Sequence, residues 1–174
     1  MATKHYRMEL SKSGINKTIE MLEKYKEHIQ NRNEVFVRRL AEIGIPVVDE
    51  QIALSYGDSN KYHQTEVVVN RFQDHVEARL VVYGEDLLFM EFGAGVTYNG
   101  AAGASPHPKG EEFGYTIGSY GKGHGKDEYW YYTDETGVSH RSYGTQATFP
   151  VYLAGQEMIQ NIRKIAREVF GSGN

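Results

Sequence analysis

The 174-residue sequence contains no cysteine, only four prolines and no long apolar run. Without cysteine the chain can form neither a disulfide framework nor a thiolate metal site, and this agrees with assembly in a reducing compartment. No apolar stretch approaches the ~20 residues that a membrane helix requires, and residues 1–10 are too polar for a signal peptide. We therefore expect a soluble, intracellular, globular protein.

The charge balance also excludes a strongly basic protein. Nineteen lysines and arginines face 23 acidic residues, which gives a formal net charge of −4. A bulk attraction to nucleic acid is therefore not indicated, although a local basic patch stays possible. The length fits one domain over residues 1–174, with room for a large insertion.

Helices are predicted at both ends of the chain. Apolar residues spaced by three and four favour a helix, or two helices, from about Ser11 to Gly44. Gly44 and Pro46 are expected to end it, and residues 47–56 fit either a short helix or a strand. The second helix carries an apolar stripe from Val151 to Val169, with Thr148 as its expected cap and Pro150 in its first turn.

Strands are predicted between these helices. Residues 65–72 are rich in β-branched side chains and residues 75–83 alternate, so the two form a hairpin. Residues 87–92 read as one or two helical turns, and residues 129–133 with 138–143 form a second hairpin. The predicted fold class is α+β, with N-terminal helices and a long C-terminal helix packed on a small antiparallel sheet, and with a long glycine-rich loop inserted.

The glycine-rich insertion covers residues 96–128. Ten of the nineteen glycines lie between Gly93 and Gly125, which excludes a regular helix there. Aromatic residues interrupt the segment, so it is no plain solvated linker. An extended arm that orders against a neighbouring subunit explains both traits.

Aromatic residues are abundant, with 13 tyrosines. The run Tyr129-Trp130-Tyr131-Tyr132 places large rings on both faces of one strand, so one face is expected to be core and the other covered. Contact with another subunit and packing within the chain are both open.

Motifs for catalysis are weak. The segment from Gly118 to Lys126 departs from a phosphate-binding loop, because Tyr120 stands where a glycine is needed and Asp127 replaces the serine or threonine that would hold magnesium. The seven histidines include no pair at i, i+4 spacing, and acidic residues such as Glu91, Glu111 and Glu112 give only a weak signal for glycoside hydrolysis. We predict no catalytic residue, no cofactor and no metal. The remaining cations of the loop, Lys122, His124 and Lys126, face either the DNA, an acidic partner or solvent.

Several short motifs, in a fixed order, resemble one known family. The segment from Leu88 to Val96 resembles the apolar-Glu-Phe-Gly-x-Gly-Val signature of the neck and tail-completion proteins that join heads to tails in siphophages and related prophages. The likeness begins upstream at Arg39–Gly44 and continues to Phe170. It includes His107-Pro108, Gly118–Gly125, Trp130-Tyr131-Tyr132, Gly144-Thr145, Pro150, Tyr152-Leu153-Ala154, Met158 and Ile162–Phe170. One departure lies at residues 142–147, where the family more often has an Arg-Gly pair and a further proline.

This resemblance implies a virion protein without an active site, assembled in the bacterial host cytoplasm. The family implies a homo-oligomeric ring, with six subunits expected, between the head connector or adaptor proteins and the tail terminator or tail tube protein. DNA would only pass through its channel, and no membrane is involved. The alternative is a carbohydrate- or nucleic-acid-processing domain with a glycine-rich substrate loop.

The hypothesis assigns contact roles to particular residues. Phe89, Phe92 and Tyr98 anchor the root of the arm, and residues 115–126 form its tip. The expected subunit or partner contacts are Phe89, Phe92, Tyr98, Tyr115, Tyr120, Trp130 and Tyr131.

Overall fold

The computed structural model describes residues 9–56, 63–84, 86–94, 105–114, 129–133 and 136–171. The α+β fold class is confirmed. In chain order the elements are α1 (Lys12–Tyr56), β1 (His63–Arg71), β2 (Val76–Gly84), α2 (Leu87–Phe92), β3 (Trp130–Thr133), β4 (Ser139–Ser142) and α4 (Pro150–Gly171).

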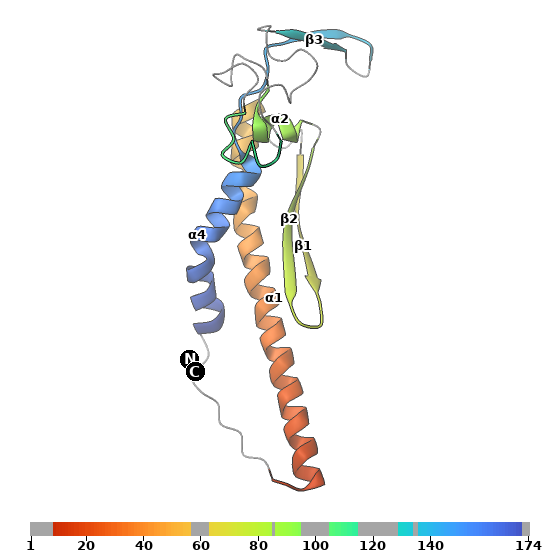
Figure 1. The fold of residues 1–174 in the computed structure, drawn as a ribbon, viewed down its shortest axis with the longest axis vertical. Coiled ribbons are helices and arrows are strands. Elements are labelled where there is room, and N and C mark those ends of the chain that lie inside the picture. The colour runs from red at the N-terminus through yellow and green to blue at the C-terminus, as the bar shows by residue number, and fades with distance from the viewer. Residues whose placement is uncertain are drawn as a thin grey trace.

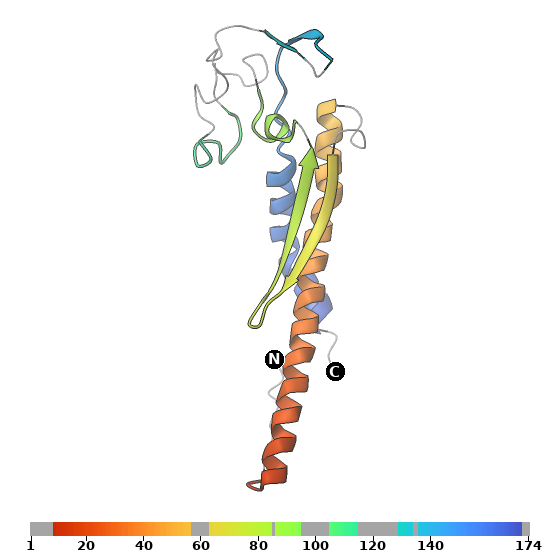
Figure 2. The ribbon, with the colours of Figure 1, turned by 90° about the vertical axis from the view of Figure 1, so that its right-hand side faces the viewer.

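Helix α1 sets the elongated shape of the molecule. Its 45 residues make a rod of about 67 Å at 1.5 Å per residue. Figures 1 and 2 show α4 and the β1–β2 hairpin lying beside its C-terminal part, while its N-terminal part extends beyond both. No helix in the described ranges is long and apolar enough to cross a membrane.

The helix does not end at Gly44 or Pro46, as the sequence predicts, but runs through both. Pro46 lies on the exposed face, where water can reach the Glu42 carbonyl that lacks its usual partner. Two further turns then place Val48 and Ile52 in the core, both with no exposed surface. Burial of these side chains outweighs the local cost of the proline, and the ambiguity over residues 47–56 is resolved as helix.

The core lies where α1, α2, α4 and the first hairpin meet. Its fully buried residues come from three helices, and Leu80 and Val82 of β2 pack against them. Gly44 permits this close approach, because an added Cβ would stand 2.5 Å from the Met158 Cε. The fully buried core residues are Val48, Ile52, Met90 and Ala154.

The β1–β2 hairpin agrees with the sequence pattern. The strands pair antiparallel, from His63 opposite Gly84 to Arg71 opposite Val76. The alternation in β2 directs Leu80 and Val82 to the core, and the tip bonds to α1 because Arg71 donates to Asn31 Oδ1 at 2.8 Å.

The β3–β4 hairpin forms a second two-stranded sheet, separate from the first. The predicted single sheet is therefore wrong. This hairpin lies at the end of the molecule where α4 begins (Figure 1), and Tyr131 and Tyr132 are 63% and 52% exposed. The expectation that one face of β3 is core is also wrong, because these neighbouring tyrosines, on opposite faces, are both exposed.

The continuity of α1 can be tested with Pro46→Ala. The alanine restores an N–H that donates to the Glu42 carbonyl, so the free energy of unfolding should rise by about 1–3 kcal/mol in urea denaturation. Pro150→Ala is the control, because a proline at the first position of α4 gives up no intrahelical bond and should not be improved upon. A fall in stability for Pro46→Ala would mean that α1 ends near residue 46.

Candidate functional site

The most connected polar group in the described ranges is the carboxylate of Glu91, near the end of α2. Its side chain is largely buried. Oε2 accepts from the Val151 N–H at 2.7 Å, and Oε1 accepts from the Tyr152 N–H at 2.9 Å. Oε1 also lies 3.0 Å from Nε2 of His107. Two segments distant in sequence thus converge on one carboxylate.

The start of α4 explains why this carboxylate is needed. The first amides of a helix have no intrahelical acceptor and carry the positive end of the helix dipole. Glu91 satisfies the amides of Val151 and Tyr152 and supplies the negative charge. Thr148, predicted as the cap, instead pairs its hydroxyl with that of Ser55 at 2.9 Å. The predicted Thr148 cap is therefore wrong, because a buried carboxylate from α2 occupies the place.

His107 completes the arrangement. The residue is 6% exposed, and its ring centroid lies 4.6 Å from that of Phe92 and 5.1 Å from that of Tyr152. Its Nδ1 accepts the N–H of Lys109 at 3.0 Å. This hydrogen-bond pattern assigns the ring proton to Nε2, which donates to Glu91. Both ring nitrogens are therefore engaged.

Backbone bonds tie the same segments together. Ala94 and Thr145 exchange two hydrogen bonds at 2.8 and 3.0 Å, and the Thr148 N–H donates to the Met90 carbonyl at 2.8 Å. The Ser105 hydroxyl donates to the Phe92 carbonyl at 2.7 Å. We call this set, residues 90–94, 105–109 and 145–152, the Glu91 junction.

The chemistry available at the Glu91 junction is limited by this saturation. A general acid or base needs an atom that can reach a substrate proton, whereas both Glu91 oxygens and both His107 nitrogens bond inside the chain. Within the described ranges no three His, Cys, Asp or Glu side chains are grouped to hold a metal ion. The arrangement caps α4 and locks residues 105–109 to α2.

The predicted contact residues fall into three groups. Phe92 is buried and faces His107 and Phe113, so its ring holds part of the glycine-rich segment against α2. Phe89 and Tyr131 are exposed, and of Trp130 only the backbone is described. The others, Tyr98, Tyr115, Tyr120, Lys122, His124 and Lys126, lie outside the described residues.

Part of the predicted arm is described. Within the range 96–128, residues 105–114 form turns that pack against α2 and α4 rather than extending away. The resemblance names both Glu91 and His107, but the sequence gives no sign that the two side chains meet. Their separation of 16 residues fits no local motif.

An exposed aromatic cluster lies on the β3–β4 hairpin. The Arg141 guanidinium lies 4.1 Å from the ring centroid of Tyr129 and 4.6 Å from that of Tyr143. Tyr132 stacks on His140 with ring centroids 5.4 Å apart. Tyrosine and arginine in this combination are typical of protein–protein contacts.

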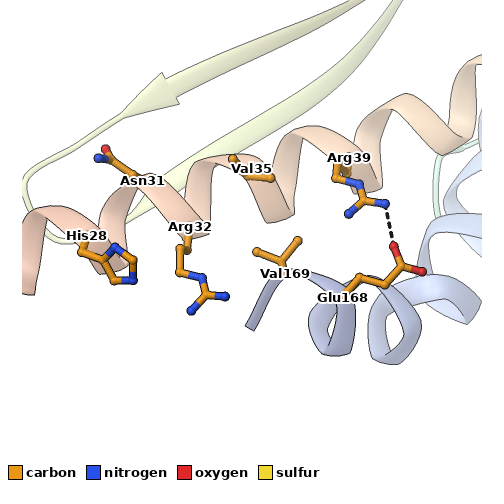
Figure 3. A pocket seen from close by; sticks show the side chains of 7 residues that line it. All are labelled: His28, Asn31, Arg32, Val35, Arg39, Glu168 and Val169. Atoms are coloured by element: carbon orange, nitrogen blue, oxygen red, sulfur yellow. Dashed lines mark hydrogen bonds and ion pairs between the residues drawn. The ribbon is translucent and has the colours of Figure 1, made fainter. Parts of the chain in front are cut away.

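An open hollow of about 330 Å³ lies where α4 ends against α1 (Figure 3). Arg39 and Glu168 face each other across it, with their nearest atoms 2.6 Å apart. Arg32 lies over the Phe170 ring at 5.7 Å. These contacts join the two helices, so the hollow marks the end of their common packing surface.

Shifted pKa values belong to the exposed β1–β2 hairpin and not to the Glu91 junction. The hydrogen bond from Arg79 lowers the pKa of Glu77, and the bond from His75 lowers that of Asp74. The hydrogen bond that Tyr83 donates to Glu66 raises the pKa of the phenol, because it stabilises the protonated form.

None of the known protein families, curated proteins or solved structures with which the chain was compared matches it.

The role of the Glu91 junction can be tested with Glu91→Gln. The amide group would direct an N–H at a backbone donor or at His107, so the free energy of unfolding should fall by about 2 kcal/mol in urea. The exposed Glu111→Gln is the matched control and should change it by less than about 0.5 kcal/mol. Equal stability of the two variants would contradict the capping role.

Proposed function

We propose that the chain is a structural component of the bacteriophage head–tail junction, a ring that joins the head connector to the tail around the DNA channel. The observation that carries the proposal is the convergence of the family-like motifs on the Glu91 junction. Glu91, His107, Thr145, Pro150 and Tyr152 come from five separate motifs of the resemblance and meet at one place in the fold.

Convergence strengthens a resemblance whose motifs are individually weak. Short chance matches have no reason to meet in space, whereas residues that form one structural unit must keep their order and chemistry together. The unit that these motifs build is a helix cap and a backbone clasp, and a capped helix serves a structural protein.

Exposed apolar and aromatic surface supports a protein that functions in an assembly. Tyr131, Leu88 and Ile159 are each more than half exposed, on three different elements. Surface of this kind, when gathered into patches, marks sites of protein–protein contact. The net charge of −4 suits a channel wall that DNA passes without being held.

The partners proposed are further copies of the chain, the head connector or adaptor proteins, and the tail terminator or tail tube protein. The place of action is the virion, after assembly in the host cytoplasm. The enzymatic alternative, a carbohydrate- or nucleic-acid-processing domain, gains no support from the saturated groups of the Glu91 junction.

A direct test combines the purified protein with tail tubes and with DNA-filled heads that carry the portal. Light scattering should report a complex larger than the free protein, and negative-stain images should show added density at the head–tail joint. A chain that binds neither partner contradicts the proposal. Turnover of a carbohydrate or nucleic acid by that chain would establish the alternative.

The predicted tip contacts can be tested by changing Tyr115, Tyr120, Lys122, His124 and Lys126 to serine together. None of them belongs to the Glu91 junction, so the thermal unfolding midpoint should stay near that of the unaltered chain. Loss of aromatic and cationic contacts should lower the yield of joined particles roughly tenfold or more. Unchanged joining would remove these residues from the contact.

A further inference from the structure

The N-terminal part of α1 carries an apolar stripe that nothing in the described ranges covers. Ile15, Leu22, Ile29 and Phe36 recur every seven residues and so share one helix face. At Phe36 this face packs on α4, where the ring centroid of Phe170 lies 5.6 Å away. Helix α4 ends one residue later, at Gly171, and the rest of the face continues past it (Figures 1 and 2).

We call these uncovered residues the α1 stripe: Ile15, Ile19, Leu22 and Tyr25. Each is between 41% and 49% exposed. A solvated helix end has no need of large apolar side chains along one face, since helical amphipathicity arises where a face is buried. The pattern indicates that another surface packs here.

Helix α4 carries a second apolar strip, separate from its buried face. Ala154, Ile165 and Val169 point inward and are buried. Val151, Ile159 and Ile162 are 50%, 60% and 43% exposed, and an added Cβ at Gly155 would meet no atom within 4 Å. We call this exposed set the α4 strip: Val151, Gly155, Ile159, Ile162 and Ala166, whose spacings of four and three keep them on one side.

The two surfaces match in length. From Ile15 to Ile29 the helix rises about 21 Å, and from Val151 to Ala166 about 22 Å, at 1.5 Å per residue. Each is therefore long enough to cover the other. Glycine and alanine in the α4 strip leave room for the larger side chains of the α1 stripe.

The charges beside the two surfaces are opposite. Glu23 and Glu27 follow Ile19 by four and eight residues, and Arg163 and Arg167 follow Ile159 by the same intervals. All four side chains belong to exposed residues and make no ion pair within the described part of the chain. An acidic border on one surface thus faces a basic border on the other when the apolar sets are apposed.

We propose that the α1 stripe of one copy packs on the α4 strip of the next copy. Both halves of the contact are present in this chain, which identifies the occupant as a second copy. The contact is not intramolecular, because the α1 stripe lies beyond the end of α4 on a continuous helix. Two different surfaces make a heterologous contact, which repeats from subunit to subunit and closes into a ring. The inference rests on the proposed function, whose ring it supplies with an interface.

Single cysteines test the contact directly, because the native chain has none. Leu22→Cys and Ile159→Cys lie at the middle of their surfaces, so they oppose each other whichever way the helices run. A short bifunctional maleimide should join the two variants when they are mixed, with the proteins alone or with tail tubes present. Lys24→Cys, on the opposite side of α1, is the control for Leu22→Cys and should give no product with Ile159→Cys. Absence of the mixed product in both conditions overturns the contact, as does a dominant Leu22→Cys homodimer.

Charge reversal gives a second, independent readout. Glu23→Lys with Glu27→Lys should weaken the oligomer in light scattering by roughly tenfold or more, and Arg163→Glu with Arg167→Glu should do the same. All four changes in one chain should restore assembly, because the borders are again opposite. Rings that persist unaltered in every variant overturn this contact and leave the proposed function standing. Cross-linked oligomers that bind neither heads nor tails overturn the proposed function and leave the contact standing.

Discussion

The buried carboxylate of Glu91 is the constraint on which the arrangement of the C-terminal half depends. A buried charge is tolerated only when hydrogen-bond donors surround it, and Glu91 finds three, two from the start of α4 and one from His107. These donors come from segments 16 to 61 residues away along the chain. Because they must all be in place together, α2, residues 105–109 and the first turn of α4 are fixed relative to one another. The Glu91 junction thus orders the elements that the family-like motifs occupy.

The position of the core accounts for the uneven surface of the molecule. The fully buried side chains, Val48, Ile52, Met90 and Ala154, lie toward the C-terminal end of α1. The other end of the helix presents apolar residues with nothing described against them. The buried residues hold the subunit together, and the exposed apolar residues of α1, α4 and the β3–β4 hairpin suit contacts with other subunits. Stability and assembly are therefore carried by different parts of one elongated fold.

Local patterns in the sequence predicted the elements whose cause is local. Alternation in residues 75–83 predicted β2, and the apolar stripe from Val151 predicted α4. The continuation of α1 through Pro46 was missed, because burial of Val48 and Ile52 is a tertiary effect that no window around the proline contains. The Thr148 cap failed for the same reason, since the acceptor comes from α2. At the site, the motifs identified Glu91 and His107 as residues but not as partners, because their contact depends on how three segments fold together.

The most direct test of this account is hydrogen exchange at the backbone amides of Val151 and Tyr152. Amides in the first turn of a helix ordinarily exchange fast, because they have no intrahelical acceptor. Bonded to a buried carboxylate, these two should exchange only when the Glu91 junction opens, at rates near those of the α4 interior. The Ser13 amide in the first turn of α1, which has no such cap, provides the comparison within the same chain. Exchange of Val151 and Tyr152 as fast as that of Ser13 would contradict the account.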